Sequence, residues 1–276
     1  MKINVPPLKC QGIKTKLVEW ICSTLPQERE GIWYEPFMGS GVVGFNVYNR
    51  HSIMADVNPH IIHFYNDIQN KNIDSNIVRT FLEQEGLSLS KQGQAHYNAI
   101  RSRFNNNHNS LDFLFLNRAG FNGLMRWNRN GNFNVPFGHK PYRFSKSYIT
   151  KIVNQIHYIS DITNAYHFEF IHSDFRDVLS KAMAQDIIYC DPPYNGKHTD
   201  YFSGWSERDE QELFELLCAT KAKFILSTWY GNDYRKNPNI QKYETRFNIK
   251  TREHFYHVGA KETNRKPVYE ALVMNY

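Results

Sequence analysis

The chain has 276 residues, of which 41% are hydrophobic and 15% aromatic, and its formal net charge is +6. This length suits one sizeable core with room for an inserted subdomain, and the high aromatic content excludes a disordered chain. The sequence has no apolar run long enough to cross a membrane, and its first residues lack the apolar core of a secretory signal. Four scattered cysteines and two spaced histidine pairs, His60/His63 and His254/His257, favour neither disulfides nor a metal site. We therefore expect a cytoplasmic protein without a metal.

Short apolar runs alternate with longer amphipathic stretches along most of the chain. They predict strands at 32–37, 52–55, 168–172, 186–190, 224–228 and 268–274, and helices at 15–23, 59–69 and 207–220, the last capped by Ser206. Such alternation is typical of an α/β fold with a doubly wound, mostly parallel sheet. The alternation stops between 69 and 163. We expect an inserted, mainly helical subdomain there, and a main domain formed by 1–68 and 164–276.

The same internal segment holds most of the positive charge. Between Lys91 and Lys151 lie ten basic residues and one acidic residue, Asp112, so this segment carries +9 and the rest of the chain −3. Asparagines and aromatic residues are interspersed with the basic ones. These side chains suit phosphates, base edges and base faces, respectively. The segment therefore favours a nucleic-acid contact over a solvated basic surface.

A glycine-rich turn follows the first predicted strand. The run Glu35-Pro36-Phe37-Met38-Gly39-Ser40-Gly41 ends a strand at an acid and opens a helix through glycines, which let the backbone approach a ligand closely. Asp56 ends the next strand, where a carboxylate can hold ribose hydroxyls. The pattern also fits a dinucleotide fingerprint. It therefore indicates a nucleoside-bearing cofactor without deciding which one.

A second motif follows the predicted strand at 186–190. It reads Asp191-Pro192-Pro193-Tyr194 and falls at the carboxyl end of that strand, the edge at which open α/β sheets bind ligands. The Asp191 carboxylate and the Pro192 carbonyl oxygen could accept two hydrogen bonds from an exocyclic amino group, and Tyr194 offers a face for stacking a base. This chemistry turns the nitrogen lone pair towards a methyl donor.

These two motifs resemble the cofactor and catalytic motifs of amino-methyltransferases that act on DNA. A third stretch, Phe121–Asn128 continuing through Gly131, Asn134, Pro136 and Gly138, resembles the recognition hairpin of the Dam-like adenine-N6 class. The resemblance covers most of the chain and implies a class I, Rossmann-like methyltransferase domain with an inserted recognition subdomain that bears a β-hairpin. It also implies S-adenosylmethionine as cofactor and double-stranded DNA as partner in a bacterial or phage-encoded enzyme.

The resemblance implies a role for each matching position. Target adenine would meet Asp191, Pro192 and Tyr194, and Arg126 would read a guanine next to it. The expected cofactor contacts are Cys10, Lys14, Glu35, Phe37, Gly39, Gly41, Asp56, Asp174, Phe175 and Asp191. The expected DNA contacts are Lys14, Arg118, Asn122, Arg126, Asn128, Pro136, Lys140 and Lys197. By its residues, the loop at 195–205 could be a lid or backbone clamp, or a plain surface loop.

The N-terminal motif departs from the family pattern. In Lys9-Cys10-Gln11-Gly12-Ile13-Lys14, Cys10 stands where the family usually has an aromatic residue, and Ile13 where a second glycine is common. The methionine end of the cofactor could therefore be held differently. Lys14 could contact cofactor or DNA, or could be an exposed lysine near a helix start.

The resemblance favours methyl transfer to adenine N6 by base flipping, in a short site that contains GA, with GATC as the leading candidate. Other methyltransferase targets, namely cytosine N4 in DNA, adenine in RNA and protein glutamine, remain open from the residues. An NAD(P)-dependent oxidoreductase would leave 191–194 unexplained, and an inactive DNA-binding regulator would not need Asp191. We expect a monomer, with a dimer and a cognate restriction endonuclease left open.

Overall fold

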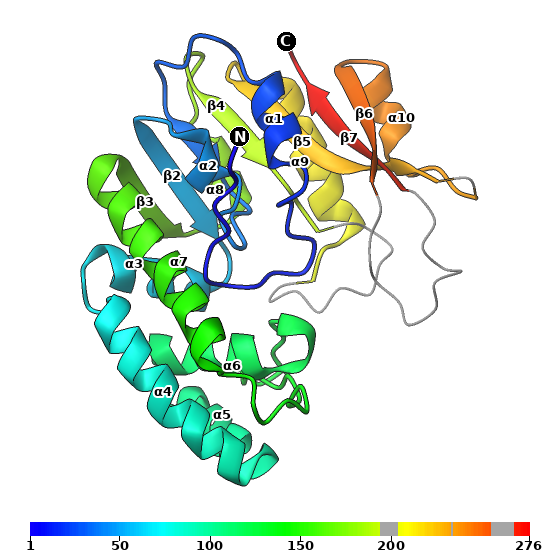
Figure 1. The fold of residues 1–276 in the computed structure, drawn as a ribbon. Coiled ribbons are helices and arrows are strands. Elements are labelled where there is room, and N and C mark those ends of the chain that lie inside the picture. The colour runs from blue at the N-terminus through cyan, green and yellow to red at the C-terminus, as the bar shows by residue number, and fades with distance from the viewer. Residues whose placement is uncertain (194–203, 233, 255–267) are drawn as a thin grey trace.

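The computed structural model describes residues 1–193, 204–232, 234–254 and 268–276. Its centre is a seven-stranded sheet with the strand order β3-β2-β1-β4-β5-β7-β6 (Figure 1). The strands are β1 Trp33–Glu35, β2 His51–Asp56, β3 His167–His172, β4 Ile187–Cys190, β5 Lys223–Gly231, β6 Asn248–His254 and β7 Val268–Met274. Strands β1 to β5 pair in parallel, whereas β7 is antiparallel to β5 and β6. The expected mostly parallel α/β sheet is confirmed.

The helices fall into two groups. The helices that precede, follow or separate the strands along the chain are α1 Val18–Thr24, α2 Gly44–Val47, α3 Pro59–Gln69, α8 Phe175–Leu179, α9 Glu207–Ala219 and α10 Ile240–Glu244. Those of the internal segment are α4 Ser75–Gln92, α5 Gln94–Asn107, α6 Ser110–Ala119, the short 3-10 helix η1 Phe121–Gly123 and α7 Lys146–Ala165. The helix α3 has the expected bounds, and α9 begins after Ser206, whose side chain forms a capping box with Asp209.

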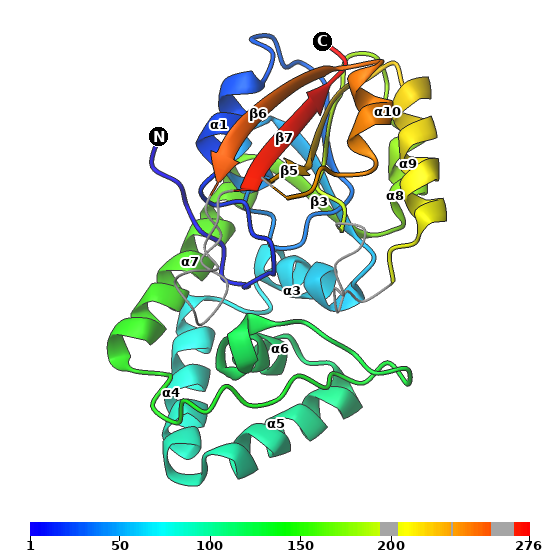
Figure 2. The ribbon, with the colours of Figure 1, turned by 90° about the vertical axis from the view of Figure 1, so that its right-hand side faces the viewer.

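Alternate residues of each strand pack on opposite faces of the sheet. Trp33, Met54 and Tyr189 belong to one buried cluster, together with α1, α2 and α3. Their neighbours Tyr34 and Ile188 belong to a second cluster, together with α8, α9 and α10. The period of two residues follows from the strand geometry, in which successive side chains point to opposite faces. Both faces are therefore covered by helices (Figure 2).

Helices α4 to α6 lie beyond the end of the sheet at which β2 finishes, and α7 returns the chain towards the start of β3 (Figures 1 and 2). The first buried cluster continues from the sheet through Phe64 of α3 to Leu82 of α4 and Phe104 of α5. The helical region is thus packed onto the sheet layer without a break in the core. Our division into a main domain and a subdomain at 69–163 stays an interpretation, and α7 crosses its second boundary.

Two differences from the expected elements have clear physical causes. The strand at Asn248–His254 was not expected, because all its side chains except that of Ile249 are charged or polar and most are exposed, so no apolar alternation marks it. It pairs as an edge strand with β7. The strand β5 runs on to Gly231, past the expected end at 228, because its pairing with β7 continues through a bulge between Trp229 and Gly231.

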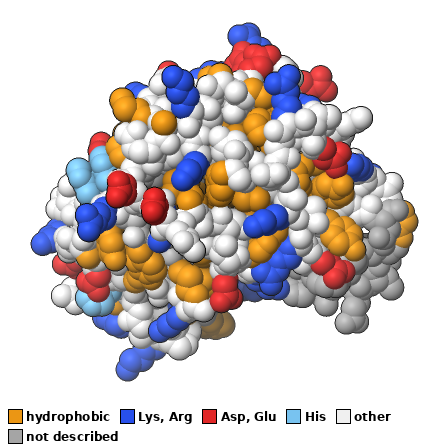
Figure 3. Space-filling view, turned by 90° about the horizontal axis from the view of Figure 1, so that it is seen from above, with side chains coloured by type: hydrophobic (Ala, Val, Ile, Leu, Met, Phe, Trp, Pro, Cys, Tyr) orange, Lys and Arg blue, Asp and Glu red, His pale blue; other side chains and the backbone are white. Residues whose placement is uncertain are grey.

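The face of the molecule seen from above carries acidic and basic side chains side by side (Figure 3). A polyanion needs a continuous basic field, so this face is a poor candidate for its binding.

Candidate active site

The glycine turn after β1 is held by backbone contacts to the end of β2. The Met38 N–H donates to the Ala55 carbonyl oxygen over 2.9 Å, and the Gly39 N–H donates to the Asp56 carboxylate over 2.8 Å. Gly41 has a φ of +71°, and a Cβ there would lie 2.5 Å from the ring of Phe45. Only glycine fits that position. The sequence therefore folds here into a tight turn at the carboxyl ends of β1 and β2.

The two acids of this region have protein partners. Asp56 accepts a second backbone hydrogen bond, from Asn58 over 2.9 Å, and burial raises its pKa to about 6. Glu35 is only 2% exposed and accepts a hydrogen bond from the Trp33 indole over 3.1 Å. Burial raises the pKa of Glu35 to about 8. Glu35 thus supports the turn from within the core, whereas Asp56 lies at its surface end and retains lone pairs for a ligand.

Asp191 lies directly after β4, beside β1 in the sheet. Lys14 Nζ lies 2.8 Å from Asp191 Oδ1 and 2.9 Å from Oδ2, and the same ammonium donates to the Gly12 carbonyl oxygen over 3.1 Å. Burial raises the pKa of Asp191, and the adjacent Lys14 charge opposes that rise. Pro192 is buried and Pro193 half-buried, while Tyr194 lies outside the described residues. The carboxylate is therefore held in place by a cation from the N-terminal segment.

This pair corrects the interpretation of Lys14 as an exposed lysine. Its side chain is 5% exposed and carries an ion pair with Asp191. Neighbouring Cys10 lies against the glycine turn, with its Sγ 3.5 Å from the position of a Cβ on Gly39. Burial raises the pKa of the Cys10 thiol, and the charges of Asp56 and Asp191 raise it further. The N-terminal motif therefore contacts both the glycine turn after β1, through Cys10, and Asp191, through Lys14.

Three aromatic rings from distant segments meet beside this edge of the sheet. Phe37 and Phe175 stack with ring centroids 5.3 Å apart, and Trp205 lies 5.6 Å from Phe37 and 5.5 Å from Phe175. The sequence motifs indicated Phe37 and Phe175 but gave Trp205 only a place in a loop. The Trp205 indole N–H donates to Glu210 over 3.3 Å, so the start of α9 fixes it. The part of the expected lid at 195–203, including Lys197, lies outside the described residues.

Asp174 caps the helix α8. Its Oδ1 accepts the Arg176 N–H over 2.9 Å, and Arg176 Nη1 lies 3.0 Å from both carboxylate oxygens. Arg176 also contacts Asp209 and Glu212 of α9. These contacts fix α8 against α9 and orient Asp174 next to Phe175.

The recognition stretch forms an irregular β-hairpin. Antiparallel bridges join Gly120 to Phe137 and Trp127 to Phe133. At the tip, the Asn128 side chain accepts the N–H groups of residues 130 and 132, both over 3.0 Å. Asn122 has a φ of +52° and is exposed. The hairpin expected from the resemblance is therefore present, but with single bridges instead of full strands.

Arg126 is held along the hairpin. Its Nε donates to Asn134 Oδ1 over 2.8 Å, and its Nη2 donates to the Asn134 carbonyl oxygen over 3.2 Å. The side chain is half-buried, so it does not project freely from the hairpin. Pro136 and Lys140, two other expected DNA contacts, are exposed on the same stretch.

Arg118 differs from its expected place on the surface. It is 4% exposed, and its guanidinium donates to the Tyr148 hydroxyl over 3.2 Å and to Gln155 Oε1 over 2.6 Å. Both partners belong to α7. A side chain buried in this way joins α6 to α7 and is not available to a phosphate, so the geometry argues against the expected DNA contact.

Asn117, which the sequence analysis missed, connects the N-terminal motif to the hairpin. Its Oδ1 accepts the Lys9 N–H over 2.8 Å, and its Nδ2 donates to the Lys9 carbonyl oxygen over 2.9 Å. A Cβ on Gly123 would lie 2.6 Å from the Lys9 side chain, so the two segments touch. No motif in the sequence marks Asn117, and only the fold shows that its side chain is completely buried between these two segments.

Comparisons with known proteins identify the family of the chain. Residues 11–258 match the family model described as D12 class N6 adenine-specific DNA methyltransferase. A DNA adenine methylase of Vibrio cholerae is 35% identical over 78% of this chain and 76% of its own length. The Type II methyltransferase M.MjaIII of Methanocaldococcus jannaschii is 29% identical over 98% of this chain and 99% of its own. The Retron Ec67 DNA adenine methylase of Escherichia coli is 32% identical over 76% of this chain and 71% of its own.

The glycine turn, the strand-end acids and the hairpin together define a methyltransferase of the amino-group class. The chain belongs to the D12 class N6 adenine-specific DNA methyltransferase family, and the enzyme is an adenine-specific DNA methyltransferase. This membership decides against the other methyltransferase targets, namely cytosine N4 in DNA, adenine in RNA and protein glutamine. It also decides against an NAD(P)-dependent oxidoreductase and an inactive DNA-binding regulator. In the described part of the chain, every helix is too short or too polar to cross a membrane.

Proposed function

We propose that the enzyme transfers the methyl group of S-adenosylmethionine to adenine N6 within a short site in duplex DNA. The observation that carries this proposal is the position of Asp191. It lies at the carboxyl end of β4, next to the glycine turn of β1, where the cofactor and the target can meet.

The residues around the turn fit such a cofactor. Gly41 allows close approach of the backbone, Asp56 can bind ribose hydroxyls, and the Phe37–Phe175 pair offers an apolar face for a nucleobase. Asp174, which borders Phe175, can accept a hydrogen bond from an adenine amino group. When bound, S-adenosylmethionine supplies an electrophilic methyl group on a sulfonium. The protein needs only to orient the acceptor nitrogen in line with it.

Asp191 and the Pro192 carbonyl oxygen would accept the two hydrogens of the target amino group. That arrangement directs the nitrogen lone pair out of the ring plane, and Tyr194 would stack on the base. An ionised Asp191 carboxylate accepts these hydrogen bonds more strongly than the neutral acid, and Lys14 favours the ionised form. The amino proton released after transfer passes to solvent or to Asp191. The enzyme forms no covalent intermediate in this scheme.

The target nitrogen lies inside a base stack, so the adenine would be flipped into the pocket. The hairpin at 120–137 would enter the DNA beside it, with Arg126 reading a guanine immediately 5′ of the target. Asn122, Asn128 and Pro136 would line the neighbouring bases and Lys140 the backbone. A site containing GA follows, with GATC as the leading candidate.

Long-read modification sequencing tests this proposal directly. DNA from cells expressing the wild-type protein should carry N6-methyladenine in one short context that contains GA. Cells expressing Asp191→Asn provide the matched control and should show none. Methylation of adenine without a fixed context would overturn the proposed readout, and methylation that persists in the Asp191→Asn cells would overturn the assigned catalytic role.

A further inference from the structure

A second cluster of functional side chains lies away from the methylation site. His51 is the first residue of β2 and His167 the first residue of β3, and the two are paired across the parallel strands. Glu169 follows two residues later on β3, on the same face as His167. His51 and His167 begin their strands, whereas Asp56 ends β2 and Asp191 follows β4, so the two histidines lie at the opposite ends of the strands from the expected active site.

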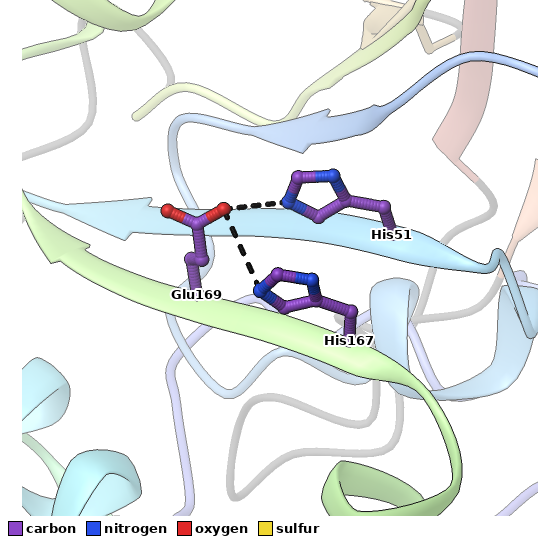
Figure 4. Close-up of side chains that lie close together, drawn as sticks. All are labelled: His51, His167 and Glu169. Carbon is purple, nitrogen blue, oxygen red and sulfur yellow. Dashed lines mark hydrogen bonds and ion pairs between the residues drawn. The ribbon is translucent and has the colours of Figure 1, made fainter.

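The three side chains converge on one point (Figure 4). His51 Nε2 lies 2.6 Å and His167 Nε2 3.8 Å from the same oxygen, Oε1 of Glu169. The two imidazole rings are stacked with centroids 4.3 Å apart and an interplanar angle of 12°. One ligand atom from each residue lies within 4.8 Å of the others. Both rings thus present Nε2 to the same carboxylate.

We propose that His51, His167 and Glu169 form a binding site for one divalent transition-metal ion of the zinc class. Zinc is held by imidazole nitrogen at about 2.0–2.1 Å and by carboxylate oxygen at similar distances, so two tetrahedral ligand atoms lie about 3.3 Å apart. The separations of 2.6 and 3.8 Å bracket this value. A shift of the Glu169 oxygen towards His167 would bring both separations near this value. One imidazole would also turn out of the stack, because both Nε2 lone pairs must point at the ion.

The donor set selects the class of metal. Two imidazoles and one carboxylate suit zinc, nickel or copper, whereas magnesium and calcium prefer oxygen ligands throughout. The side chains of His51, His167 and Glu169 are 31%, 66% and 42% exposed, so an ion can enter from solvent and a water molecule can fill its fourth position.

The position of the cluster suggests what the metal does. The strand β3 is at the edge of the sheet and pairs with β2. The helix α7, which leads back from the helical region, ends at Ala165, just before His167. A metal bound to both strands would fasten β3 and the end of α7 to β2. Binding to the folded state alone would raise thermal stability by mass action.

Zinc titration of untagged, chelator-treated, full-length protein tests the site. We expect one zinc ion per chain by competition with a chromophoric chelator, and cobalt added in place of zinc should give visible absorption bands that zinc abolishes. Both His167→Gln and Glu169→Gln should weaken binding about tenfold or more, because each removes one of three protein ligands. The melting temperature of the wild type should rise with zinc, and that of the variants should not.

His157→Gln is the matched control. His157 and Asp161 form another exposed histidine–carboxylate pair, with Nε2 3.5 Å from the carboxylate oxygen, but on a helix and without a second histidine in the described cluster. Its loss should leave zinc binding unchanged. Zinc binding that is not saturable at one ion per chain, or that survives the double change His51→Gln and His167→Gln, would overturn the site. Circular dichroism of each variant without metal separates lost binding from lost folding.

Discussion

Lys14 Nζ lies 2.8 Å from Asp191 Oδ1, although 177 residues separate the two in the chain. The contact joins the N-terminal motif to the motif proposed to be catalytic, and burial of the Asp191 carboxylate raises its pKa. A buried carboxylate favours its neutral form, and an adjacent cation favours the ionised form. The pKa of Asp191 is raised by burial and lowered by Lys14, so the lysine sets how far into acid the carboxylate can still accept a hydrogen bond.

Lys14→Met should narrow the pH range of methylation from the acidic side. Without the ammonium, the pKa of Asp191 rises further above its ordinary value. The ionised form, which is present above that pKa, is then lost at a higher pH as the solution is acidified. Single-turnover methylation rates measured against pH should show the acidic limb of the variant's profile shifted to higher pH. The rate at alkaline pH should be reduced less than the rate at acidic pH.

Lys14→Arg is the control for charge, because it keeps a cation beside Asp191 with a different shape. Its acidic limb should stay close to that of the wild type. An acidic limb that is the same in Lys14→Met and the wild type would show that the ion pair has no influence on the reacting carboxylate.

Substitutions of Asp191 and of Asp56 should affect different quantities, the methylation rate and the affinity for the cofactor, respectively. Asp191→Ala removes an acceptor of the target amino group, so the single-turnover rate should fall by about two orders of magnitude or more, while calorimetric affinity for S-adenosylmethionine stays within a few fold. Asp56→Ala removes the acceptor of the Gly39 and Asn58 N–H groups as well as the proposed ribose contact. It should weaken cofactor affinity first. If the two variants have the same profile, the division of roles is wrong.

The sheet and the strand-end acids were predictable because they depend on local pattern. Apolar runs that end in Glu35, Asp56 and Asp191 indicate strands that finish at one edge, and the structure has them there. The Lys14–Asp191 pair was not predictable, because it depends on how the N-terminal segment crosses that edge. Arg118 shows the opposite limit: charge along the sequence suggested a surface contact, and only the packing of α6 on α7 reveals its burial.

Arg118→Ala should lower stability rather than DNA affinity. The change leaves a cavity and removes the donor to Gln155, each a cost of about 1–3 kcal/mol, so the free energy of unfolding should fall by about 2–6 kcal/mol. Urea unfolding measures this directly. Lys146→Ala, at an exposed position of the same basic segment, should change stability by less than about 0.5 kcal/mol. Equal destabilisation of both variants would contradict the structural role of Arg118.

Salt dependence of DNA affinity should show whether the basic segment meets phosphates. With roughly six phosphate contacts, the logarithm of the association constant should fall against the logarithm of salt with a slope near about −5. Lys146→Ala should weaken all sequences alike and make the slope shallower by about 1. Arg103→Ala should affect the slope less than sequence alone suggests, because Arg103 forms ion pairs with Glu85 and Asp112. A flat wild-type slope would mean that this segment does not contact the DNA backbone.

Arg126 provides the most specific test of sequence readout. A bidentate contact to guanine needs two guanidinium N–H groups, and Asn134 accepts from Nε and Nη2 in this structure. DNA binding would therefore exchange part of the Asn134 contact for the base. Arg126→Ala should cost about 1–3 kcal/mol of discrimination at one base pair and leave non-specific affinity largely intact. Methylation of the preferred site is compared with that of variants changed at each position.

Asn134→Ala distinguishes readout by Arg126 from a purely structural contact within the hairpin. If Arg126 reads guanine, Asn134→Ala frees its guanidinium from one acceptor but keeps the side chain that touches the base. Discrimination at the guanine should then fall less than in Arg126→Ala. If the pair only braces the hairpin, both variants remove the same hydrogen bond between the Arg126 Nε and Asn134 Oδ1. They should then reduce discrimination evenly at all positions. Loss confined to one base pair in Arg126→Ala, with a smaller loss at that pair in Asn134→Ala, would assign the guanine contact to Arg126.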